Sequence, residues 1–283
     1  MPFLKRRTGQ QIYYECHGHS GPMVILLHGL ASSSRIWLHQ VRVLQKYCRV
    51  YALDFPGHGR SDWQSHYSLR DYTNAIKALM DTCQLEKASL IAISLGCSVA
   101  LDFAASYPER VDKLILEGPV GGCYTAKNPL GWLDQTVFRL LPIGIELSLW
   151  MFGYHATAHW INTFGVKAKR NFRVLESVQH KTDHQAIRQL LWDSACPPYV
   201  GALEQINQET LLIRGAHDPM PKRFTDYIRR HLPKVCYLEI PETRHLVALE
   251  KPRLFNALIL NFLKLTSVNQ GNVDHSVNLT SIN

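Results

Sequence analysis

A serine stands where an apolar run passes directly into a helix-like segment. Residues 88–97 read ASLIAISLGC, so Ser94 ends a predicted strand and begins a predicted helix. Such a strand-to-helix turn holds a serine in strained backbone geometry with its hydroxyl exposed, as nucleophilic catalysis requires. The small residues Ala92 and Gly96 leave room for the helix and the neighbouring strand to approach each other. A serine that only caps a helix is the structural alternative, but this placement predicts the nucleophile of an acyl transfer.

A serine hydroxyl becomes a good nucleophile only beside a general base, which an acid must orient. His245 follows the last predicted strand, and Asp218 follows the strand before it. Both are expected at the carboxyl edge of the sheet, where open α/β sheets build their sites. We therefore predict Ser94, Asp218 and His245 as nucleophile, acid and base. Glu117, at the end of an earlier strand, is the alternative acid.

Backbone N–H groups are expected to stabilise the oxyanion that such a reaction forms. Residues 28–30, HGL, follow a buried strand, and Gly29 permits a turn that aims the Leu30 N–H into the site. The second donor is predicted to be the N–H of Leu95, directly after the nucleophile. His28 is predicted to hold this loop by hydrogen bonding rather than to transfer protons.

The elements that must position these residues alternate between strand-like and helix-like segments. The predicted strands cover 23–27, 50–53, 88–93, 111–116, 210–214 and 235–240, and the predicted helices cover 36–45, 69–80, 96–107, 221–231 and 253–265. This alternation predicts an α/β fold with a mostly parallel central sheet and helices on both faces.

The alternation stops in the middle of the chain. We interpret residues 121–204 as a helical cap inserted into one core domain, which residues 1–120 and 205–265 form. Residues 266–283 are aperiodic and polar, and we expect a disordered tail there. The large apolar residues of the insertion favour a lipophilic pocket. They are Trp132, Phe138, Leu140, Leu141, Ile143, Leu147, Leu149, Trp150, Met151, Phe152, Trp160 and Phe164.

Together these motifs resemble the α/β-hydrolase fold superfamily, in the capped group of esterases, lactonases, C–C hydrolases and non-haem peroxidases. Residues 53–61, LDFPGHGRS, are similar to the D-x-P-G-x-G-x-S loop of that family, and His245 with Glu250 and Pro252 resembles its C-terminal histidine block. Two positions where glycine is common hold Ala92 and Arg244 instead. The resemblance covers residues 10–120 and 205–265 and implies a scaffolding role for the glycine loop.

The residues and the resemblance together predict a serine hydrolase that cleaves a carboxylic ester, thioester or lactone of a small to medium lipophilic substrate through an acyl-enzyme on Ser94. A C–C bond hydrolase and a synthase or lyase similar to those of menaquinone biosynthesis are alternatives on the same fold. The latter group usually carries an arginine soon after the elbow glycine, where this chain has Cys97 and Ser98. A non-enzymatic, hydrolase-like ligand receptor is a further alternative.

The charge distribution and the cysteine spacing bear on whether the chain binds nucleic acid, a metal or a cofactor. Lys and Arg number 31 and Asp and Glu number 23, a formal net charge of +8, but the basic clusters at 5–7, 167–170, 222–223 and 229–230 are scattered. We therefore expect no nucleic-acid partner. The cysteines form no C-x-x-C pair, so we expect no zinc or thioredoxin-like site and free thiols in a reducing compartment. They are Cys16, Cys48, Cys83, Cys97, Cys123, Cys196 and Cys236. The predicted acyl transfer needs no metal and no cofactor.

Neither end nor middle of the chain predicts a membrane segment. The first residues carry charge before any apolar stretch, so we expect no secretory signal. The apolar stretch 137–154 is interrupted by Arg139, Pro142 and Glu146 and is short for a membrane span. We expect a cytoplasmic protein, with peripheral membrane contact of the apolar insertion as a less favoured alternative.

Overall fold

The computed structural model describes residues 3–6, 9–120, 181–195 and 197–265, together with scattered positions between 136 and 179. Most of the predicted cap lies outside the described residues, as do the predicted tail, Cys123 and Cys196. Of the twelve large apolar residues named above for the cap, four are described and are about half exposed to solvent. They are Leu140, Ile143, Leu147 and Met151.

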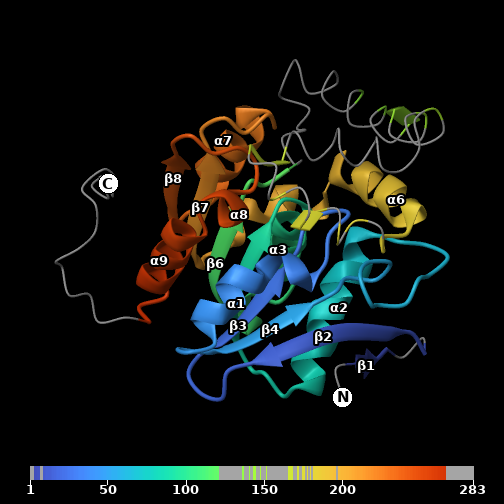
Figure 1. Cartoon of the computed structure of the whole chain (residues 1–283), viewed down its shortest axis with the longest axis horizontal. Helices are drawn as coiled ribbons and strands as arrows, with labels where there is room; N and C mark the ends of the chain where they lie inside the picture. Colours follow the sequence, from blue (N-terminus) through green and yellow to red (C-terminus); the bar gives the residue numbers. More distant parts are fainter. Residues whose placement is uncertain are drawn as a thin grey trace.

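An eight-stranded sheet forms the centre of the described fold (Figure 1). The strands are β1 (Phe3–Lys5), β2 (Gln11–His17), β3 (Met23–Leu27), β4 (Arg49–Leu53), β5 (Ala88–Ile93), β6 (Val111–Glu117), β7 (Glu209–Gly215) and β8 (Val235–Ile240). Their order is β1-β2-β4-β3-β5-β6-β7-β8. Only β1 and β2 run antiparallel to their neighbours, and all other pairs are parallel. The predicted α/β class with a mostly parallel sheet is confirmed.

The sequence pattern does not predict β1 and β2, and burial explains why. Strands β3 and β5 are buried almost throughout, which gives their sequences a continuous apolar run. Strand β2 buries only Ile12 and Tyr13 fully and exposes or half-exposes its other residues. An antiparallel strand near the sheet edge can keep polar residues on its solvent side, so its sequence carries a weaker signal.

Helices cover both faces of the sheet. The α-helices are α1 (Leu38–Leu44), α2 (Leu69–Thr82), α3 (Leu95–Ser106), α6 (His184–Ala195), α7 (Lys222–His231), α8 (Val247–Glu250) and α9 (Pro252–Phe262), and the 3₁₀ helices are η1 (Ser34–Trp37), η2 (Pro108–Arg110) and η3 (Pro198–Gln205). Residues of α2, α3, α6 and η3 pack into one hydrophobic core, and residues of α1, α8 and α9 pack into a second. None of the helices in the described ranges is long and apolar enough to cross a membrane.

The start of α2 shows how a local sequence signal fixes an element. Ser68 accepts a hydrogen bond from the Asp71 N–H, and the Asp71 carboxylate accepts one from the Ser68 N–H at 3.1 Å. This reciprocal pair is a capping box, which satisfies two N–H groups that the first turn of a helix leaves unpaired. The capping residues therefore set where α2 begins.

The parallel strands bring the candidate residues to one edge. In register, Leu27 of β3 pairs with Ala92 of β5, and Ile93 pairs with Glu117 of β6. Glu117 pairs in turn with Ile213 of β7. The segments that follow β3, β5, β6, β7 and β8 therefore meet at the carboxyl edge of the sheet.

Candidate active site

Ser94 occupies a strained turn between β5 and α3. Its backbone angles are φ 54° and ψ −119°, a left-handed conformation that side-chain-bearing residues rarely adopt. The turn is held by two backbone hydrogen bonds, from the Ser94 N–H to the Glu117 oxygen at 2.8 Å and from the Cys97 N–H to the Ser94 oxygen at 2.9 Å. Gly96 is needed for space, because a Cβ there would lie 2.6 Å from the Leu27 oxygen.

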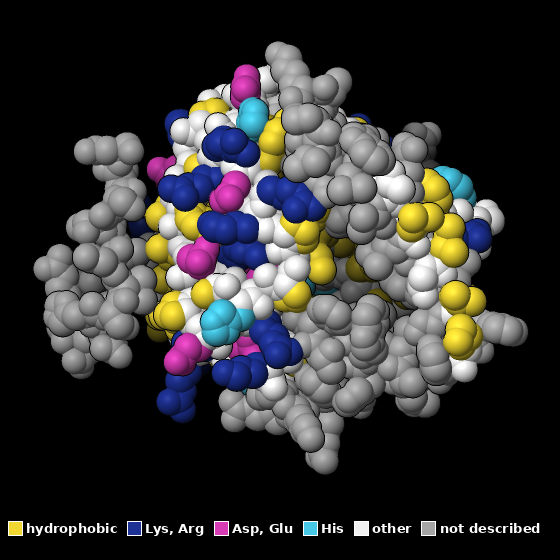
Figure 2. Space-filling view, turned by 90° about the horizontal axis from the view of Figure 1, so that it is seen from above, with side chains coloured by type: hydrophobic (Ala, Val, Ile, Leu, Met, Phe, Trp, Pro, Cys, Tyr) yellow, Lys and Arg dark blue, Asp and Glu magenta, His cyan; other side chains and the backbone are white. Residues whose placement is uncertain are grey.

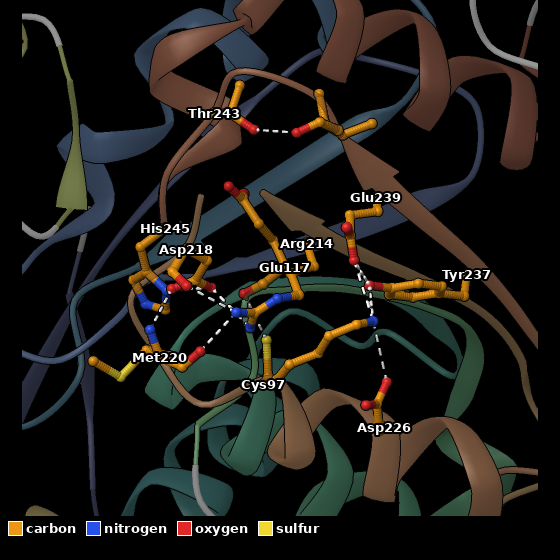
Figure 3. Close-up of polar contacts among 12 residues, drawn as sticks. Cys97, Glu117, Arg214, Asp218, Met220, Asp226, Tyr237, Glu239, Thr243 and His245 are labelled. Atoms are coloured by element: carbon orange, nitrogen blue, oxygen red, sulfur yellow. Dashed lines mark hydrogen bonds and ion pairs between the residues drawn. The ribbon is translucent and has the colours of Figure 1, made fainter. Parts of the chain in front are cut away.

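Asp218 and His245 form a hydrogen-bonded pair. The Nδ1 atom of His245 lies 3.0 Å from Oδ2 of Asp218, whose side chain is fully buried (Figure 3). Burial alone would raise the pKa of Asp218. The charge and hydrogen bond of His245, with the Met220 N–H and Arg214, outweigh that effect and hold the pKa below its ordinary value. Asp218 is therefore ionised at neutral pH and can orient His245.

Arg214 supports this acid, and the sequence interpretation missed it. Its guanidinium lies 3.4 Å from Asp218 Oδ2 and donates to the backbone oxygens of Asp218 at 2.8 Å and Met220 at 2.6 Å. Figure 3 shows the side chain reaching from β7 to this loop. The signal was present, because an arginine inside the apolar strand TLLIRG must find partners when it is buried.

Residues 117–118 contact both Ser94 and His245. A Cβ added at Gly118, which has φ 55°, would lie 2.9 Å from Cε1 of His245, so the imidazole rests against this backbone. Ser94 is tied to Glu117 by its N–H. Within the described part of the chain, no direct hydrogen bond joins Ser94 Oγ to His245. Catalytic hydrogen bonds of this kind are often long in the absence of substrate and tighten when it binds.

Among the hydrogen bonds of the described residues, the alternative acid, Glu117, makes none with the imidazole. Its Oε1 accepts a hydrogen bond from the Ala248 N–H at 2.9 Å, while Asp218 holds His245. The geometry therefore favours Asp218 as the orienting acid. Glu117 still ends β6 at this edge of the sheet, as the sequence predicts.

Two N–H groups are free to face a substrate oxygen. Among the hydrogen bonds of the described residues, neither the Leu30 N–H nor the Leu95 N–H donates to a protein group. Gly29, directly before Leu30, packs against Ser94, since a Cβ there would come within 3.1 Å of Ser94 Cβ. The reason for the glycine differs from the predicted one: it is the close approach to Ser94, and the left-handed turn falls on Ala31, with φ 51°.

Two fully buried histidines hold the loop that carries Leu30. The Phe55 N–H donates to Nε2 of His28 at 3.0 Å. The proton of the neutral His28 ring is therefore on Nδ1, which donates to the Gly29 oxygen at 2.7 Å. His58, which the sequence interpretation assigned no role, accepts from the Ala31 N–H at 3.3 Å. Burial lowers the pKa of His28 to about 4 and that of His58 to about 3. Both are neutral loop supports in this geometry.

The buried state of His28 predicts a pH-dependent stability. Its pKa is lower in the folded chain than the ordinary value of 6.5, so its contribution is complete above pH 6.5 and is lost as pH falls towards 4. The loss amounts to about 3 kcal/mol. Urea unfolding at pH 7 and pH 4 should show that His28→Gln loses less stability than the wild type. His19→Gln, at an exposed position, is the control and should follow the wild type; equal pH slopes for all three proteins would refute the assignment.

The glycine loop after β4 acts as scaffold in the geometry. Asp54 is buried, and its two carboxylate oxygens accept from the Ser34 N–H at 2.6 Å and the Arg60 N–H at 2.9 Å. Gly59 has φ 60°, and a Cβ there would lie 2.2 Å from an Asp54 oxygen. The loop therefore braces the segment that follows Leu30 and presents no reactive group of its own.

The described residues hold no candidate metal site, and many of their Lys and Arg side chains lie beside Asp and Glu side chains (Figure 2). No group of three or more His, Cys, Asp or Glu side chains in the described ranges is placed to hold a metal ion. On the face seen in Figure 2, Lys and Arg side chains are interspersed with Asp and Glu side chains. Among the ion pairs of the described residues, Lys222 of α7 lies 3.4 Å from Asp226 and 3.2 Å from Glu239. Part of the positive charge is thus paired within the protein.

Comparison with known proteins agrees with the fold described above. The family model of the alpha/beta hydrolase fold matches residues 22–252. A putative 2-succinyl-6-hydroxy-2,4-cyclohexadiene-1-carboxylate synthase of Bacillus subtilis is 26% identical over 260 residues, which cover 85% of this chain and 89% of that protein. A 2-hydroxy-6-oxo-6-phenylhexa-2,4-dienoate hydrolase of Comamonas testosteroni is 38% identical over 137 residues, which cover 46% of this chain and 47% of that protein.

Solved structures show the same fold. An esterase from Exiguobacterium antarcticum superposes with a TM-score of 0.81 at 19% identity, over 93% of this chain and 98% of that one. At this identity the likeness concerns the fold alone.

Proposed function

The chain belongs to the α/β-hydrolase fold family, and on that premise we propose that it is a serine hydrolase. Its proposed substrate is a carboxylic ester, thioester or lactone of small to medium size and lipophilic character. The observation that carries the proposal is the Asp218–His245 pair at the same sheet edge as the strained Ser94 turn. This arrangement supplies an oriented base near the half-buried Ser94, as acyl transfer needs.

In the first step, Ser94 Oγ attacks the substrate carbonyl carbon while Nε2 of His245 takes the hydroxyl proton. Asp218 accepts the hydrogen bond from Nδ1–H, which fixes the imidazole tautomer and stabilises the imidazolium. The N–H groups of Leu30 and Leu95 donate to the oxyanion. His245 then gives its proton to the leaving alcohol or thiol, and the acyl group stays on Ser94.

In the second step, water replaces the leaving group. His245 takes a proton from the water as it attacks the acyl carbon, and the same two N–H groups stabilise the second oxyanion. Collapse of this intermediate returns the proton to Ser94 Oγ and releases the carboxylic acid. Both steps use protein side chains and backbone only.

The relatives support two alternatives on the same residues. The name of the Bacillus relative favours a synthase or lyase, and the name of the Comamonas relative favours cleavage of a C–C bond. Cys97 and Ser98, which stand where the menaquinone-pathway group usually has an arginine, are both buried. The Cys97 thiol donates to the Ala92 oxygen and the Ser98 hydroxyl to the Val120 oxygen. These positions therefore support the elbow and offer no cation to an anionic substrate.

The organisation of the chain and its compartment are part of the proposal. We assign residues 1–120 and 205–265 to the catalytic core, 121–204 to a cap that selects the substrate, and 266–283 to a tail outside the fold. The five described cysteines carry free thiols, two of them buried, which suits a reducing compartment such as the cytoplasm.

A substrate series tests the proposed class. We expect the kcat/KM for p-nitrophenyl esters to rise about tenfold or more from acetate to octanoate, because each buried methylene adds apolar contact. A steady fall with acyl length would remove the lipophilic pocket. A vinylogous diketone substrate, assayed in parallel, would support the C–C hydrolase alternative if it were turned over faster than every ester. Ester binding without any turnover would support the receptor alternative.

A further inference from the structure

Glu117 contacts two different parts of the candidate site. Its backbone oxygen accepts a hydrogen bond from the Ser94 N–H at 2.8 Å, and its Oε1 accepts one from the Ala248 N–H at 2.9 Å. Ser94 opens α3, and Ala248 lies in α8, directly after the segment that carries His245. One residue therefore connects the backbone of the candidate nucleophile with the loop of the candidate base.

The contact between Glu117 and α8 is buried, so water does not compete for its hydrogen bond. Glu117 and Ala248 are both fully buried, so water cannot replace the carboxyl group as the acceptor of the Ala248 N–H. The Cys97 thiol donates to the same backbone oxygen that holds Ser94, as Figure 3 shows. Loss of the side-chain acceptor would leave a buried N–H unpaired at the start of α8.

The residue after Glu117 extends the contact to the imidazole itself. A Cβ at Gly118 would lie 2.9 Å from Cε1 and 3.0 Å from Nδ1 of His245. The imidazole therefore packs against the backbone that Glu117 anchors. A shift of α8 away from Glu117 would move His245 relative to Ser94.

We propose that Glu117 is a positioning residue of the hydrolase, which sets the distance between Ser94 and His245 by holding the elbow with its backbone oxygen and α8 with its carboxyl group. This inference rests on the proposed function of those two residues. It gives the buried glutamate a task distinct from that of Asp218, which orients the imidazole directly.

The protonation state of Glu117 suggests the variant that should preserve this task. Burial raises the pKa of Glu117 to about 8, although the Ala248 and Val247 N–H groups oppose the rise. The charges that face it are those of Asp218 and Glu250, which add to the rise, and Cys97 lies beside it. At neutral pH the carboxyl group is mostly protonated. A glutamine has nearly the same shape, an oxygen for Ala248 and no charge.

The test compares Glu117→Met with Glu117→Gln. Methionine fills the space without an acceptor, and we expect kcat for a p-nitrophenyl ester to fall about 10²-fold with little change in KM, the effect of a small misplacement of catalytic groups. Glutamine should keep kcat close to that of the wild type. Leu79→Ala, a buried change on α2 away from the site, is the control and should lower the melting temperature without lowering kcat.

Further readouts keep the test decisive. Rates are normalised by fluorophosphonate titration of reactive sites. If the methionine variant does not fold, Glu117→Asp takes its place, because its carboxyl group is too short to reach Ala248. The expected fall in kcat is the same. A wild-type kcat in the methionine variant, or in the aspartate variant that replaces it, would overturn the positioning role. Ser94→Ala is run beside them: its full activity would refute the proposed function, whereas its inactivity with an active methionine variant would refute the role of Glu117 alone.

Discussion

Replacing Ser94 with alanine should lower kcat for a p-nitrophenyl ester by about 10⁴- to 10⁶-fold, as removal of a serine nucleophile does elsewhere. The reason is that the proposed nucleophile would be lost while the Leu30 and Leu95 N–H groups remain. Steady-state kinetics against the uncatalysed hydrolysis rate, with melting temperatures for both proteins, measures the effect.

Ser89→Ala is the matched control for this experiment. Ser89 lies on β5, the strand that leads into Ser94, and its buried hydroxyl donates to Asp112 at 3.2 Å, away from the carboxyl edge. Its variant should keep full activity. If Ser94→Ala retained more than a small fraction of the wild-type rate, the turnover would have to come from another residue or from a contaminant.

The second large effect is expected at Asp218. Asp218→Asn should lower kcat by about 10⁴-fold, because an amide that donates to Nδ1 stabilises the wrong imidazole tautomer and cannot balance the imidazolium charge. The low pKa of Asp218 means that the wild type keeps this carboxylate ionised throughout a neutral to alkaline assay. The deficit should therefore persist from pH 7 to pH 9 in kinetic profiles.

Glu117→Gln serves as the comparison for Asp218→Asn, since it makes the same chemical change in the alternative acid. The geometry predicts a near-normal rate for it, because the Glu117 carboxyl group contacts Ala248 and not His245. The opposite result, a normal rate for Asp218→Asn and an inactive Glu117→Gln, would transfer the role of the acid to Glu117.

The parallel part of the fold and the placement of the candidate residues were predictable because both depend on local sequence. Continuous apolar runs marked β3 and β5, and the carboxyl ends of such strands must share one edge. Residues directly after those ends, such as Ser94 and His245, could therefore be assigned to that edge before any coordinates were known. Strand β2 was missed because its burial is partial and its apolar pattern is weak.

The supporting residues were harder to predict because their partners come from distant parts of the chain. His58 accepts from the Ala31 N–H, and Arg214 donates to backbone oxygens of the Asp218 loop. A backbone group is present at every residue, so the sequence does not mark which one a buried polar side chain will meet. For Gly29, the sequence suggested a special turn, whereas the structure shows a close approach to Ser94 and places the left-handed φ on Ala31.

The most direct test of the central claim is to identify the residue that a fluorophosphonate probe modifies. The account predicts one adduct, on the tryptic peptide that contains Ser94, and loss of esterase activity in proportion to labelling. Asp218→Asn should react much more slowly, and Ser94→Ala should not react. An adduct on another serine, or an unlabelled wild-type protein that still hydrolyses esters, would contradict the assignment of Ser94 as the nucleophile.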